Sequence, residues 1–201
     1  MIRHAFALSD RLAAIVDSLL PTLARLVFSG VLLGYFWSSA LTKFDGSPFA
    51  LSSGAFVQIY PKAMEAVGYD NGQLGLLAHL VVLAGTWAEV ILPLLVLVGL
   101  ATRLAALGMI GFVAVQTLTD VFGHNAAFGG WFDRVPDALA DQRGLWVFLL
   151  VVIAAKGAGP LSADRFARQW VSGRRAISAR NPPNAHIAMG NMVNTPKPNA
   201  K

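Results

Sequence analysis

The chain has 201 residues, of which 55% are hydrophobic and only 13% are charged, and its mean hydropathy is +0.56. This composition is too apolar and too poor in charge for an ordinary soluble domain of this length, so it indicates an integral membrane protein. Cysteine is absent, which excludes disulfides, thiolate-ligated clusters and a dithiol relay within this chain. Redox chemistry would therefore require a bound cofactor or a partner.

A net charge of +5 is compatible with a nucleic-acid partner, but the positions of the basic residues favour a membrane role instead. Most of them lie beside predicted membrane spans, on the side that also holds both termini. The positive-inside rule then predicts a multi-pass protein with both termini cytoplasmic, and we expect it in the bacterial cytoplasmic (inner) membrane. We interpret the basic residues as an orientation signal and anionic-lipid contact, and predict no nucleic-acid partner. Asp17 and Arg25 interrupt the apolar part of a possible signal peptide, so we expect the N-terminal segment to be retained.

The N-terminal part of the chain predicts two helices. Residues 1–21 have the amphipathic pattern of an interfacial helix, with apolar side chains on one face. Pro21 fits the first turn of the next helix or a kink, and residues 22–41 form the first predicted span. Gly30 and Gly34 make a GxxxG pattern in this span. Such a pattern lets two membrane helices approach closely and is compatible with a homo-oligomer.

The second predicted span, residues 74–100, contains no Lys, Arg or Asp and exceeds the roughly 20 residues that a helix needs to cross a bilayer. Its single acidic residue, Glu89, lies near the middle, where an ionised carboxylate costs about 2.5 to 3.5 kcal/mol. Before this span, a short helix at about residues 55–67, broken at Pro61, is expected at the membrane surface. A tight turn at residues 101–103 makes the second and third spans antiparallel neighbours.

Two further spans complete the predicted bundle, at residues 104–122 and 144–157. The last span is short and carries Lys156 near its end. Residues 159–180 then predict a basic cytoplasmic helix, and the polar, proline-rich residues 181–201 predict a disordered tail. The sequence thus predicts an all-α membrane protein, with an antiparallel four-helix transmembrane bundle over residues 22–158 and interfacial helices.

Polar residues in these spans gather at two depths. At about 1.5 Å per residue, Tyr35, Glu89 and Gln116 fall at one height, about 16 to 20 Å from the predicted cytoplasmic ends of three spans. A second level near the outer rim holds the remaining candidates: Lys43, His79 and His124, with Asp120 about one turn beneath His124. The two levels predict a polar funnel that opens to the outer face, with Glu89 at its floor.

We interpret Glu89 as a proton acceptor or as a hydrogen-bond partner for the head group of a ligand. The alternative is that a protonated Glu89 bonds Gln116 and Tyr35 and only fixes the register of the helices. His79 and His124 could ligate a metal or haem, but a third ligand is not defined, and rim histidines facing lipid head groups explain them equally well. The sequence therefore predicts no metal site.

Three stretches of the sequence together resemble the DoxX family. The first is GVLLGYFWSSALTKFDG, a span that ends in a lysine before an acidic and glycine-containing turn. The second is AGTWAEVILPLLVLVGLATRLAAL, where a glutamate is followed by a leucine- and glycine-rich half-helix and Thr-Arg at the turn. The third is AKGAGPLSADRF, after the last span. The resemblance covers about residues 23–166, and by position it singles out Lys43, Glu89 and Arg103.

This resemblance implies a four-helix membrane bundle. It also implies a redox setting, because members are similar to the small subunit of an archaeal thiosulfate:quinone oxidoreductase or accompany redox-stress enzymes. The first functional hypothesis is a membrane component of a quinone-linked redox system, in which Glu89 exchanges a proton with the quinone and a partner subunit supplies the electrons. The second is a non-catalytic anchor or assembly partner for a soluble enzyme. A proton-coupled transporter is a third option, although no inverted repeat is evident in the sequence.

Overall fold

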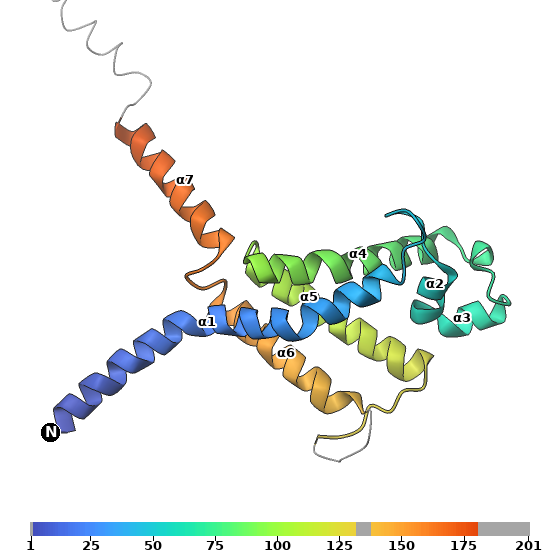
Figure 1. The fold of residues 1–201 in the computed structure, drawn as a ribbon, viewed down its shortest axis with the longest axis horizontal. Coiled ribbons are helices and arrows are strands. Elements are labelled where there is room, and N and C mark those ends of the chain that lie inside the picture. The colour runs from blue at the N-terminus through green and yellow to red at the C-terminus, as the bar shows by residue number, and fades with distance from the viewer. Residues whose placement is uncertain (1, 132–137, 181–201) are drawn as a thin grey trace, which may run out of the picture. The chain divides into compact units, whose positions relative to one another are not determined.

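The computed structural model describes residues 2–131 and 138–180, and these residues form helices with one isolated β-bridge, between Phe44 and Leu51 (Figure 1). The elements are α1 (Ile2–Leu41), α2 (Ser53–Ile59), α3 (Pro61–Ala66), a 3-10 turn η1 (Asn71–Gln73), α4 (Leu76–Val98), α5 (Thr102–Leu118), a π-helical turn η2 (Thr119–Gly123), α6 (Leu139–Lys156) and α7 (Ala163–Arg180). The predicted tail at residues 181–201 lies outside the described residues. The chain divides into two compact units, residues 1–164 and 165–201.

Three of the described helices are long and apolar enough to cross a membrane: Leu8–Leu41 within α1, Leu76–Val98, and Thr102–Gly123, which joins α5 to η2. The prediction of an all-α protein with membrane spans is therefore confirmed. Helix α6 has 18 residues and carries Asp141, Arg143 and Lys156, which leaves only a short apolar stretch between its charged ends. A fourth span thus stays a prediction.

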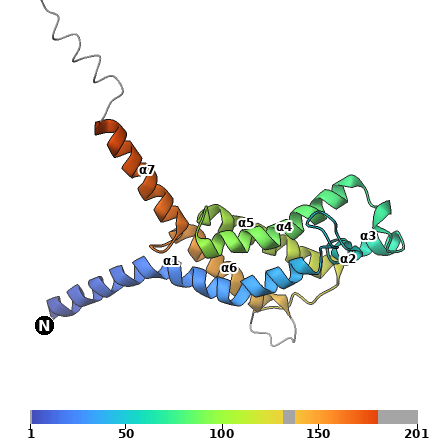
Figure 2. The ribbon, with the colours of Figure 1, turned by 45° about the horizontal axis from the view of Figure 1, so that its top comes forward.

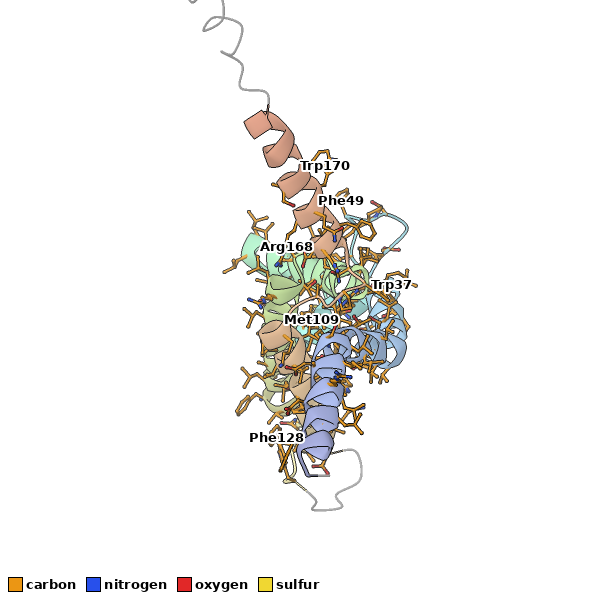
Figure 3. All side chains as sticks on the ribbon, turned by 90° about the vertical axis from the view of Figure 1, so that its left-hand side faces the viewer. Trp37, Phe49, Met109, Phe128, Arg168 and Trp170 are labelled. Carbon is orange, nitrogen blue, oxygen red and sulfur yellow. The ribbon has the colours of Figure 1, made fainter. Side chains whose placement is uncertain are left out.

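Helices α1, α4, α5 and α6 of the first unit pack around a common core. Helix α1 contacts α4 and α6, and α5 contacts the same two helices, an arrangement that Figures 1 and 2 show from two directions. The core is filled by large buried side chains from the packed helices: Phe28, Leu32, Phe36, Val96, Met109, Val113, Trp146, Leu150 and Ile153. Met109, labelled in Figure 3, is fully buried.

Helix α1 runs unbroken through Pro21, although the sequence predicted a separate interfacial helix before the first span. A proline inside a helix removes one backbone donor and favours a bend, and α1 changes direction along its length (Figure 1). One turn further on, Arg25 is buried, and its guanidinium donates to the carbonyl oxygens of Val96, Leu97, Ala158 and Leu161. These contacts satisfy carbonyls at the end of α4 and after α6.

The turn between α4 and α5 contacts Asp164, so the stretch AGTWAEVILPLLVLVGLATRLAAL and the stretch AKGAGPLSADRF meet here. Gly99 ends α4 with φ +75°, and the Asp164 carboxylate accepts hydrogen bonds from the backbone N–H groups of Ala101 and Thr102 at 2.8 and 3.0 Å and from the Thr102 hydroxyl at 2.9 Å. The Asp164 N–H in turn donates to the Gly99 carbonyl at 2.9 Å. Asp164 therefore satisfies free donors at the start of α5, as a capping carboxylate does.

Helices α2 and α3 lie at the end of the bundle where α1 ends and α4 begins (Figures 1 and 2). The expected break at Pro61 is observed, because Tyr60 separates the two helices and Pro61 occupies the first position of α3. A second buried cluster, built around Phe56, Met64 and Val82, packs these helices onto α4. This packing brings the end of α2 beside the candidate site described below.

Helix α7 starts in the first unit and continues into the second as a basic helix. The Phe166 and Trp170 side chains are exposed, and Figure 3 labels Arg168 and Trp170 on this helix. The observed helix lies within the residues 159–180 that the sequence predicted to be helical. Its cytoplasmic location stays a prediction.

Candidate functional site

A buried ion pair joins the end of α1 to the middle of α4. The Lys43 Nζ atom lies 2.7 Å from Glu89 Oε2 and 2.9 Å from Oε1, and the two side chains are only 3% and 7% exposed. Lys43 also donates to the Ser39 hydroxyl at 2.6 Å, so each of the three ammonium protons has an acceptor. Glu89 therefore has a counter-ion inside the bundle, and this counter-ion offsets the cost of an ionised carboxylate within a membrane span.

The backbone of Lys43 is fixed by the loop that follows α1. Its N–H donates to the Ala40 carbonyl at 3.0 Å, and its carbonyl accepts from the Ser52 N–H at 2.9 Å. The side chain turns back along α1 towards Ser39, so the ammonium lies deeper in the bundle than the Lys43 Cα. Levelling by rise per residue places Cα atoms only, and for this reason it separated Lys43 from Glu89.

Tyr35 and Gln116 pair with each other. The Gln116 side-chain amide donates to the Tyr35 hydroxyl at 3.1 Å, and the Tyr35 ring packs at a tilt of 57° against Trp146, with 5.3 Å between the ring centroids. The alternative in which Gln116 and Tyr35 bond Glu89 is therefore not what the structure contains. The Gln116 Oε1 atom is buried without a hydrogen-bond partner, so this acceptor is available to a ligand.

A second ion pair lies at the end of α5. The Arg143 Nη2 atom is 2.7 Å from Asp120 Oδ2, and the Arg143 guanidinium lies over the Trp146 ring at 4.7 Å from its centroid. Asp120 belongs to the π-helical turn η2, and such turns are frequent at functional sites. Sequence reasoning missed Arg143 as a site residue and treated it only as a loop charge. Its place one turn before Trp146 is the signal that could have identified it.

The remaining predicted residues lie in different surroundings. His124 is exposed, and its Nε2 atom lies 3.0 Å from the Gln58 carbonyl oxygen. His79 packs against the Phe56 ring at 4.7 Å, and the Arg103 guanidinium donates to the Ala155 carbonyl near the α4–α5 turn. Neither His79 nor Arg103 is brought to the two ion pairs. Within residues 2–131 and 138–180, no group of three or more His, Cys, Asp or Glu could hold a metal.

A cavity of about 550 Å³ unites most of these groups. Its polar lining comprises Tyr35, Ser39, Lys43, Gln58, Glu89, Gln116, Thr119, Asp120 and His124. Its apolar lining comprises Ile59, Val81, Ala84, Gly85, Ala88, Leu92, Gly108, Gly111, Phe112 and Val115. Lys43 and His124 lie just after α1 and η2, and the other residues come from α1, α2, α4, α5 and η2, so five elements and the ends of two loops shape one amphipathic cavity around a buried ion pair.

The fold and this cavity define a class of protein, a small helical membrane protein with a polar site inside its packed spans. The DoxX family model matches residues 20–125, just over half of the chain, and the chain belongs to this family. The predicted resemblance is therefore confirmed, and the match includes Lys43, Glu89 and Asp120. No curated protein and no solved structure matches the chain.

Proposed function

We propose that this DoxX-family protein binds a quinone in the cavity and serves as a membrane component of a quinone-linked redox system. One observation carries the proposal: the buried Lys43–Glu89 pair lines a cavity that combines polar groups with an apolar wall. A lipid-soluble molecule with a polar head and an apolar body matches that combination. We also propose a bacterial inner-membrane location, and the distribution of the basic residues supports cytoplasmic termini.

The charge balance of the cavity favours a neutral head group. Glu89 is compensated by Lys43, and Asp120 is compensated by Arg143. A site for an inorganic anion or a metal cation would instead present uncompensated charge of the opposite sign. A quinone is neutral in both its oxidised and its fully reduced form, so it can enter this cavity without leaving a buried charge unpaired.

The residues have distinct roles in this proposal. A bound quinone would supply the redox chemistry, the uptake or release of two electrons and two protons. Glu89 would accept one of the two protons from a hydroxyl of the reduced form at one carboxylate oxygen, Lys43 would hold that carboxylate in place, and the second proton would leave to solvent. Gln116 can hydrogen-bond to the carbonyl of the oxidised form or to the hydroxyl of the reduced form, because rotation of its amide exchanges donor and acceptor. The electrons pass to or from a redox partner subunit, since this chain has no cysteine for a cluster or dithiol relay.

The test is the affinity of the purified, delipidated protein for an added quinone. Glu89→Gln removes the charged acceptor with little change in shape, and losing a hydrogen bond to a charged group costs about 1.5 to 3 kcal/mol, or about 10- to 150-fold in Kd. Glu65→Gln is the matched control, because Glu65 is exposed on α3 and does not line the cavity. Equal affinities of wild type and Glu89→Gln would remove the proposed role of Glu89.

A non-catalytic anchor for a soluble enzyme is the second candidate function. The observation that favours it is the second unit of the chain, in which Phe166 and Trp170 are exposed on a basic helix. If the protein is an anchor, deletion of residues 165–201 abolishes co-purification of the partner, and Glu89→Gln has no effect on it. The quinone proposal instead predicts that Glu89→Gln lowers a quinone-dependent activity.

A further inference from the structure

We propose that the cavity opens sideways to the bilayer between α4 and α5, and that the quinone enters from the lipid with its apolar tail lying in this opening. The inference rests on the proposed function and adds to it the route of access and the part of the ligand that each wall contacts. The opening, called here the α4–α5 groove, is lined by Val81, Ala84 and Ala88 of α4 and by Gly108, Gly111 and Val115 of α5. The sequence had instead predicted a funnel that opens to the outer face.

The groove residues form one continuous stripe on each helix. On both α4 and α5 they follow the spacing i, i+3, i+7, which places them on a single helical face. Ala84 and Gly111 are exposed, and Val115 is 63% exposed. Helices α4 and α5 diverge from their shared turn (Figure 1), so their facing sides separate towards the α2–α3 end of the bundle.

The depth of the stripe decides what solvent it faces. At about 1.5 Å per residue, Gly111 lies about 14 Å from the start of α5, and Ala88 lies about 15 Å from the end of α4. The hydrocarbon core of a bilayer is about 30 Å thick, so both residues lie near its centre. Surface that is exposed at this depth faces lipid rather than water. The opening is therefore matched to an apolar chain.

The groove is continuous with the polar site. Ala88 precedes Glu89 on α4, Val115 precedes Gln116 on α5, and all four residues line the same cavity. A head group at Glu89 and Gln116 thus leaves its tail no polar surface to cross before it reaches the lipid. Ordinary acyl chains, a partner helix or a second copy could also cover an apolar groove. Only a molecule with both a neutral polar head and an apolar tail uses the polar site and the groove together.

Small side chains keep the groove open. A Cβ atom at Gly111 would meet nothing within 4 Å, so a larger side chain there projects into the groove without displacing the protein. At Gly108, nearer the α4–α5 turn, a Cβ atom would lie 3.1 Å from Leu92, which marks where the groove closes. Gly30 on α1 offers a matched control, because it is also exposed within a candidate span, meets nothing within 4 Å and does not line the cavity.

The experiment compares Gly111→Leu with Gly30→Leu in detergent, with two probes: a quinone with a long isoprenoid tail and a tail-less, water-soluble quinone. For Gly111→Leu we expect the affinity for the tailed quinone to fall about tenfold or more, because overpacking an occupied site by a few methylene groups costs that much. The affinity for the tail-less quinone should stay unchanged, and Gly30→Leu should match wild type with both probes. Ala84→Phe, on the opposite wall, should repeat the selective loss.

Wild-type affinity of Gly111→Leu and Ala84→Phe for the tailed quinone would overturn the groove assignment and leave the proposed function standing. Equal loss of both probes in both variants would also overturn it, since the groove would then have no separate role. Failure of wild type to bind either probe would overturn the proposed function itself. A tailed quinone with a photoreactive tail end should label the stripe on α4 or α5, and labelling confined to α1 would contradict the inference.

Discussion

The buried pair of Lys43 and Glu89 makes a quantitative prediction about stability. Lys43→Met leaves the Glu89 carboxylate, whose side chain is 7% exposed, without its counter-ion. Breaking a buried pair by removing one partner costs about 3 to 5 kcal/mol, and Glu89→Met should cost a similar amount because it strands the ammonium. The double variant removes both charges, and replacing a whole buried pair by apolar groups is often neutral, so we expect it to lose at most about 1 kcal/mol.

The assay is a double-variant cycle on the free energy of unfolding, measured by reversible SDS titration in mixed micelles with tryptophan fluorescence as the readout. Lys156→Met is the control, because Lys156 and Asp17 form a pair at 2.9 Å whose side chains are 44% and 67% exposed. A surface pair of this kind contributes about 0 to 1 kcal/mol. The reasoning is refuted if Lys43→Met costs no more than Lys156→Met, or if the double variant loses the sum of the two single losses.

Two further predictions concern the turns that hold the helices in place. Asp164→Ala should lower the free energy of unfolding by about 0.5 to 2 kcal/mol, since it removes the cap at the start of α5, and Asp164→Asn should recover part of the loss; full stability of the alanine variant would contradict the capping role. Gly159→Ala should cost about 1 to 3 kcal/mol, because Gly159 has φ +74° and a Cβ atom there would clash with the Thr22 hydroxyl and lie 3.0 Å from the Thr22 backbone nitrogen. The same titration measures it against Gly30→Ala, which should gain up to about 1 kcal/mol in the open helix position.

The membrane-spanning character of the chain could be predicted from the sequence because hydrocarbon imposes a strong constraint on composition. The apolar run around Glu89 and the tight turn after Leu100 predicted α4, α5 and their antiparallel packing. The sequence left open whether Pro21 begins a new helix or kinks a continuous one, and the structure contains one helix that continues through Pro21. A proline pattern alone does not distinguish these outcomes, since neighbouring helices decide whether the freed backbone group is satisfied.

The candidate site could be predicted in part. Glu89 stood out because an acid in the middle of a span is costly, and Tyr35 and Gln116 shared its height. The actual partner, Lys43, was placed at another level because sequence spacing gives depth along the axis but neither the direction nor the reach of a long side chain. Arg143 was missed for a related reason, since its pairing with Asp120 depends on how α6 packs beside α5.

The most direct test of the account is the quinone content of the wild-type protein as it is isolated from its own membrane. The protein would be purified in mild detergent and extracted with organic solvent, and quinone would be quantified per chain beside Glu89→Gln and the control Glu65→Gln. The account predicts close to one quinone per chain in wild type and Glu65→Gln, and a loss in Glu89→Gln. Absence of quinone from all three proteins, in membranes that contain it, would contradict the central claim and favour the anchor function.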